Sequence, residues 1–207
     1  MSKLSGLQDL VPQLENINLN QVASMLQVKI DPQILENKLG NRLLYPQTVP
    51  LTETDLVFDL NLLQEALKSH PQSYYSSSLK KIVIPEELTQ LFPNLQHLVW
   101  AFVNVFHPVG ITTVFIKSQR LGTKSLGTII KPEVLESGGD IKIEADGKSY
   151  LVKIGSLLVL PLVGRKIDIK FESNFAKLSG QNSLTTEVFG GELGLMVDAR
   201  ISFPKKP

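Results

Sequence analysis

The chain has 207 residues and a formal net charge of +1, from 21 basic and 20 acidic side chains, and it contains no cysteine. The missing cysteines exclude disulfides, thiolate metal sites and thiol nucleophiles, and the balanced charge disfavours nucleic acid and anionic lipid as partners. No apolar run approaches the ~20 residues of a membrane span and the first residues do not resemble a signal peptide, so we expect a cytoplasmic protein without a membrane span.

Short helices are predicted for the first part of the chain. Apolar residues recur at helical spacing in residues 7–14 and again in residues 22–26. A third helix should begin at Asp31, a suitable N-cap that precedes a proline, and should end at Gly40. Residues 41–50 contain two prolines and no periodicity, so they predict an ordered connector.

The strongest helical pattern covers Thr52 to Ser69. Thr52 is a suitable N-cap, and Asp55 stands in the first turn, where a negative charge is favoured. The predicted apolar face is a row of leucines at helical spacing, namely Leu56, Leu60, Leu63 and Leu67.

Strands and helices alternate in the next stretch. The pattern predicts a strand at 79–84, a helix from Pro85 to a break at Pro93, a helix at 94–106 and a strand at 111–116. This order favours a small α/β unit.

From about Leu121 the hydrophobic period changes to two. An Asp146-Gly147 pair predicts a two-residue type I′ turn, which would place Ile143 opposite Tyr150 and Ile141 opposite Val152. Further alternating runs cover 166–171 and 193–201, where Met196, Asp198 and Arg200 fall on the polar face. We therefore predict an α+β fold, with a helical and α/β part at 1–120 and a small β-barrel or sandwich at 121–207.

The residues able to carry chemistry show no catalytic or metal-binding pattern. His70, His97 and His107 lack metal-ligand spacing, and no His-Glu-x-x-His or Gly-x-Ser-x-Gly segment occurs. Gly138-Gly139 and Gly190-Gly191 precede predicted strands rather than helices, so we interpret both as turns or bulges and not as phosphate sites. The sequence predicts no catalytic, cofactor-binding or metal-binding residue.

Three further features have a structural interpretation. Glu86 and Glu87 stand at a predicted helix start, where the helix dipole favours acidic residues. Trp100 lies on an apolar helical face and is expected in the core. Asp198 and Arg200 are two residues apart on the predicted polar face of a strand, so we interpret them as a surface pair worth at most ~1 kcal/mol.

Four segments occur in an order that resembles a known family. They are Asn-Arg-Leu-Leu-Tyr-Pro-Gln-Thr-Val-Pro at 41–50, Phe-His-Pro-Val-Gly-Ile-Thr at 106–112, Leu-Gly-Thr-Ile-Ile at 126–130 and Gly-Gly-Glu-Leu-Gly-Leu-Met-Val-Asp-Ala-Arg at 190–200. Together they resemble the C-terminal region of the MutL-type proteins encoded beside coenzyme-B12-dependent glutamate mutase, which belong to the actin-like ATPase superfamily. The resemblance implies the end of an actin-like lobe without its phosphate-binding half.

The chain departs from this family at the nucleotide site. Where the family has a strand followed by two glycines, this chain has Pro85, Glu86 and Glu87. The glycines would let a nucleotide approach the backbone, whereas the two carboxylates repel phosphate. We therefore expect no ATP binding and no cofactor.

The leading functional hypothesis is a non-catalytic protein-binding or assembly module, with a protein partner or a second copy of the chain. The alternative is an ATP-dependent chaperone-like or reactivating factor for a B12-dependent mutase, and a third possibility is a small-ligand carrier that uses the interior of the β part. We expect the docking surface within residues 82–104, near Pro85 and Trp100, rather than on the strand face that carries Lys166 and Lys170.

Overall fold

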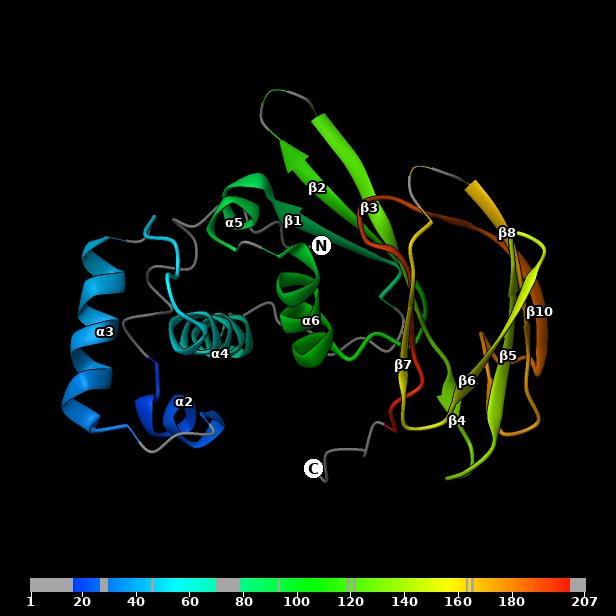
Figure 1. Ribbon diagram of the computed structural model, residues 1–207, viewed down its shortest axis with the longest axis horizontal. Helices are drawn as coiled ribbons and strands as arrows, with labels where there is room; N and C mark the ends of the chain where they lie inside the picture. Colours follow the sequence, from blue (N-terminus) through cyan, green and yellow to red (C-terminus); the bar gives the residue numbers. More distant parts are fainter. Residues whose placement is uncertain are drawn as a thin grey trace. The chain divides into compact units, whose positions relative to one another are not determined.

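The structure is a computed structural model that describes residues 17–26, 30–45, 47–69, 79–92, 94–118, 120, 122–162, 164 and 166–201. The fold is mixed α+β, as predicted, and it divides into two compact units. Within the described residues, one unit contains the helices together with the last residues of β1 and β2, and the other contains the rest of the strands (Figure 1). None of the described helices is both long enough and apolar enough to cross a membrane.

The helices agree closely with the sequence pattern. They are α2 (Leu19–Met25), α3 (Pro32–Leu44), α4 (Glu53–Ser69), α5 (Glu86–Leu91) and α6 (Leu95–Phe106). The predicted helices near 22–26, 31–40, 52–69, 86–92 and 94–106 are thus confirmed. The helical pattern at 7–14 lies outside the described residues.

Helix α3 does not end at Gly40, as the sequence predicted, but continues for one more turn to Leu44. Glycine within a helix costs only about 1 kcal/mol relative to alanine. The extra turn carries Arg42, whose guanidinium is bound by Asp59 of α4. This tertiary interaction outweighs the weak local signal of the glycine.

Helix α4 lies at the centre of the helical unit. Phe58 and Leu62 join Val22 of α2 and Leu35 of α3 in one apolar cluster, and α4 also packs against α6. Leu63 and Leu67 are buried as predicted, whereas Leu56 and Leu60 are only half-buried. The predicted face was therefore too narrow, because α4 has neighbours on more than one side.

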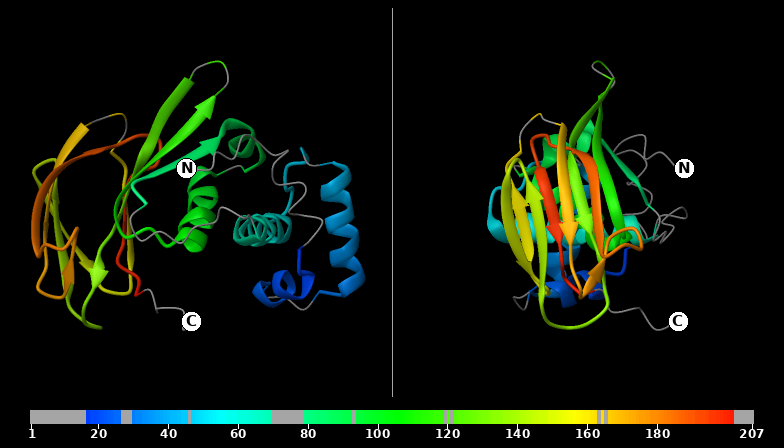
Figure 2. Two further views of the ribbon diagram at one scale, coloured as in Figure 1. Left: turned by 180° about the vertical axis from the view of Figure 1, so that it is seen from behind. Right: turned by 90° about the vertical axis from the view of Figure 1, so that its right-hand side faces the viewer.

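The strands in the described part of the chain form three sheets (Figure 2). The five-stranded sheet has the order β1-β2-β3-β11-β7, the four-stranded sheet the order β10-β8-β5-β6, and β4 pairs with β9. The strands are β1 (Lys81–Pro85), β2 (Gly110–Ser118), β3 (Gly122–Lys131), β4 (Glu133–Val134), β5 (Asp140–Ala145), β6 (Lys148–Lys153), β7 (Leu157–Leu160), β8 (Lys166–Glu172), β9 (Ala176–Lys177), β10 (Ser183–Phe189) and β11 (Gly194–Asp198).

The predicted hairpin is confirmed residue by residue. Strands β5 and β6 are antiparallel, with Ile143 opposite Tyr150 and Ile141 opposite Val152. Asp146 and Gly147 both have positive φ, 52° and 74°, which is the backbone that a type I′ turn requires.

The two larger sheets share one apolar core. Ile141, Ile143 and Phe171 of the four-stranded sheet pack in the same cluster as Ile130 and Leu195 of the five-stranded sheet. Within the described residues neither sheet closes on itself, because each has two edge strands. The barrel expectation is therefore wrong, and the sandwich that was predicted beside it describes the sheets.

The five-stranded sheet extends across the expected boundary at residue 120. Strands β1 and β2 precede that residue, yet β2 is hydrogen-bonded to β3, which follows it. The strands at 81–85 and 110–118 therefore do not form a separate α/β sheet, because they complete one edge of the sheet that β3, β11 and β7 continue.

Candidate functional site

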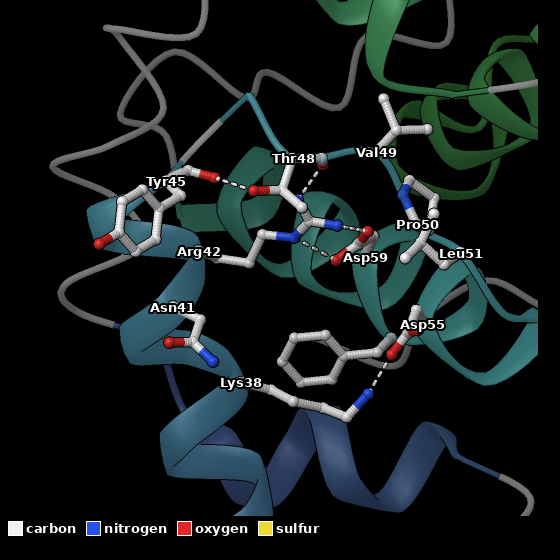
Figure 3. A pocket seen from close by; sticks show the side chains of 11 residues that line it. Lys38, Asn41, Arg42, Tyr45, Thr48, Val49, Pro50, Leu51, Asp55 and Asp59 are labelled. Atoms are coloured by element: carbon white, nitrogen blue, oxygen red, sulfur yellow. Dashed lines mark hydrogen bonds and ion pairs between the residues drawn. The ribbon is translucent and has the colours of Figure 1, made fainter.

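A pocket of about 300 Å³ lies in the helical unit between α3, α4 and the connector that joins them. This volume is at the lower end of the range typical of ligand pockets. Figure 3 shows its walls, with Lys38, Asn41 and Arg42 on one helix and Asp55 and Asp59 on the other.

The connector reaches α4 through a well-formed helix start. The Asp55 amide donates to Thr52 Oγ1 at 3.1 Å, and the Thr52 hydroxyl donates back to Asp55 Oδ2 at 2.7 Å. This reciprocal pair satisfies a helix N–H that would otherwise lack a partner, so the predicted cap is confirmed. It also fixes the Asp55 carboxylate at the mouth of the pocket.

Lys38 of α3 forms an ion pair with Asp55 of α4 (Figure 3). The hydrogen bond from Lys38, followed by that from Thr52, lowers the pKa of Asp55 below its ordinary value. Asp55 is therefore a carboxylate near neutral pH. The Lys38 ammonium is also 5.8 Å from the centre of the Phe58 ring, within the range of a cation–π interaction.

Arg42 connects three parts of the pocket. Its guanidinium donates to both carboxylate oxygens of Asp59, with Nε 2.7 Å from Oδ1, and also to the carbonyl oxygen of Thr48 in the connector. Burial raises the pKa of Asp59, and the hydrogen bonds from Arg42 oppose this shift. Since the fork of arginine suits bidentate binding, Arg42 holds α3, α4 and the connector together.

Apolar side chains stand exposed along the connector. Leu44 is 72% exposed, Tyr45 65%, Val49 43% and Leu51 91%, and the last three of these line the pocket. We call these four residues the connector patch. Buried Phe58 also lines the pocket, so an apolar wall lies inside and apolar side chains lie at the rim.

The charged side chains of the pocket are paired with one another. The lining residues include no histidine, serine or cysteine. Within the described part of the chain, no group of three or more histidine, aspartate or glutamate side chains is arranged to hold a metal ion.

The structure does not place an apolar surface where the sequence analysis expected docking. Among the described residues of 82–104, the exposed side chains are all polar, and they are Gln90, Asn94, His97 and Asn104. Trp100 is half-buried, and Pro85 is buried. The expectation was wrong because α6 turns its apolar side chains into the interior.

The described histidines and the glutamate pair stand on different elements. His97 is exposed on α6, and His107 follows that helix with a φ of 45°, while His70 lies outside the described residues. Glu86 and Glu87 occupy the first turn of α5, as predicted, where they place negative charge after β1.

Asp198 and Arg200 are not the surface pair that the sequence suggested. Asp198 is fully buried and accepts a hydrogen bond from Lys131 of β3 at 3.0 Å and from Arg200 Nε at 2.8 Å. Burial alone would raise the pKa of Asp198, but Arg200 and Lys131 outweigh it, and the pKa is lowered. The interpretation failed because β11 is a central strand with every residue buried.

The glycine-rich segment before β11 serves close backbone packing. A Cβ on Gly191 would lie 2.3 Å from the carbonyl oxygen of Leu126, and one on Gly194 would lie 2.0 Å from that of Leu160. Neither position admits a side chain without movement of the backbone. This supports the interpretation of the glycines as structural and not as a phosphate site.

The connector patch was not predicted as a site, although its sequence contained a signal. Val49 and Leu51 are large apolar residues in a segment without helical or strand periodicity. In such a segment these side chains belong to no apolar face of a helix or strand that would bury them. Their proximity to Lys38 and Arg42 depends on how α3 and α4 pack, which the sequence pattern does not reveal.

Comparisons with known proteins identify no family for this chain. No family model matches its sequence, no curated protein matches it, and no solved structure matches its fold. The functional argument therefore depends on the geometry of the chain itself.

Proposed function

We propose that the chain is a non-catalytic protein-binding or assembly module and that the connector patch is its docking surface. The observation that carries this proposal is that exposed Tyr45, Val49 and Leu51 line a pocket of about 300 Å³, while exposed Leu44 precedes Tyr45 at the end of α3. Exposed apolar side chains that gather at one place can mark an interaction site, whereas ones scattered singly do not.

Two hydrogen bonds that hold the connector near Tyr45 and Thr48 support the proposal. Arg42 holds the carbonyl of Thr48, and Thr48 Oγ1 donates to the Tyr45 carbonyl at 2.9 Å. An apolar surface that is already held in place loses little conformational entropy when a partner covers it. The resemblance to MutL-type proteins of glutamate mutase operons, with a degraded nucleotide site, is consistent with a scaffold whose remaining use is protein contact.

The alternative, an ATP-dependent reactivating factor for a B12-dependent mutase, is disfavoured by the start of α5. Pro85 caps this helix without a side-chain hydrogen bond, and Glu86 and Glu87 follow directly. These carboxylates repel phosphate. We expect titration calorimetry with millimolar Mg-ATP to show no saturable heat, and a saturable signal in the wild type would revive the alternative.

Site-specific photo-cross-linking tests the proposed docking surface. A photoreactive benzoylphenylalanine at Leu51 should yield a covalent protein adduct in the cells that make this chain. The same amino acid at Leu151, which is 72% exposed on strand β6, is the matched control and should yield none. Equal labelling from both positions, or none from Leu51, would refute the proposal.

A further inference from the structure

We draw no further inference here: the strongest candidate, the edge of strand β6 that has no partner strand within the described residues and carries exposed Leu151 between Lys148 and Lys153, supports no proposal because nothing in the structure shows what covers it.

Discussion

At the scale of single residues, the ion pair between Lys131 and Asp198 is buried on both sides, with side chains 5% and 0% exposed. Lys131 is 4% exposed, and its ammonium also donates to the carbonyl oxygen of Arg200 at 3.2 Å. Removal of one partner from a buried ion pair leaves the other charge with less compensation, which costs more than the pair contributes to stability.

We therefore expect Lys131→Met to lower the free energy of unfolding by about 3 kcal/mol, because Asp198 keeps only Arg200. Urea unfolding measures this loss. Lys124→Met, which breaks the exposed pair between Lys124 and Glu192, is the matched control and should change stability by less than about 1 kcal/mol. Similar losses of unfolding free energy in both variants would show that burial does not decide how much the ion pair contributes to stability.

The contribution of Asp198 should depend on pH in a defined direction. Because the pKa of Asp198 is lowered from 3.8 in the folded protein, its stabilising effect is complete above that ordinary value and disappears as the pH falls through the folded-state pKa. The difference in stability between wild type and Asp198→Asn should therefore be largest near neutral pH and shrink below pH 3.8. A difference in stability that grows as the pH falls would mean that the pKa of Asp198 is raised in the folded protein and not lowered.

Two glycines allow strain and steric clash to be separated. Gly194 and Gly164 both have a φ of 69°, but a Cβ at Gly194 meets a carbonyl oxygen at 2.0 Å whereas a Cβ at Gly164 has nothing within 4 Å. We expect Gly164→Ala to cost about 1 kcal/mol from backbone strain alone and Gly194→Ala to cost several times more. Thermal unfolding of both variants measures the two losses of stability. Equal losses would mean that the backbone of the sheet moves at Gly194 to make room for the new side chain.

These residues also show which structural features a local sequence pattern does not reveal. The alternation across 193–201 correctly indicated a strand, but alternation assigns one face to solvent, and β11 has no solvent face. Whether Asp198 is buried depends on which strands flank it, and Lys131 is 67 residues away in the chain. Pairing over such a distance leaves no local signal.

At the scale of elements, local signals were reliable where the local chemistry decides the structure. The Asp146-Gly147 turn determined its own register, and the Thr52 cap determined the start of α4. Gly40 failed as a stop signal because Arg42 is bound by Asp59 from another helix. The pocket was missed for the same reason, since α3 and α4 are bridged by long side chains.

The cap of α4 offers a test at this scale. Thr52→Ala should lower the free energy of unfolding by about 1 kcal/mol, because the Asp55 amide loses its acceptor. Thr54→Ala is the matched control, since Thr54 is exposed in the same turn and should be nearly neutral. Denaturant titration compares the two. If neither substitution changed the free energy of unfolding, the Thr52 cap would not be what positions Asp55 at the pocket.

At the scale of the whole molecule, the pairing of the strands decides where the chain can be divided, and the change of hydrophobic period does not. The five-stranded sheet combines β1 and β2, which precede residue 120, with β3, β7 and β11, which follow it. A chain cut at the boundary that the change of period suggested would therefore divide a sheet.

We expect a fragment of residues 121–207 to be insoluble or unfolded, because loss of β2 leaves β3 as an unprotected edge. Light scattering and circular dichroism of the fragment check this outcome. Co-expression with residues 1–120 should restore solubility if the missing strands are the cause. A stable, monomeric fragment would instead show that the strands after residue 121 fold alone.

The place of β11 in the sheet also has a consequence for synthesis on the ribosome. Residues 194–198 lie between β3, with which they pair in parallel, and β7, with which they pair antiparallel. Both neighbours are translated earlier, so each emerges from the exit tunnel with an unpaired edge toward the gap. Translation proceeds at about 5–20 residues per second, so β3 waits for seconds before residues 194–198 arrive. The edges of β3 and β7 that pair with β11 therefore lack their partner until residues 194–198 are made, and an unpaired strand edge is prone to aggregation.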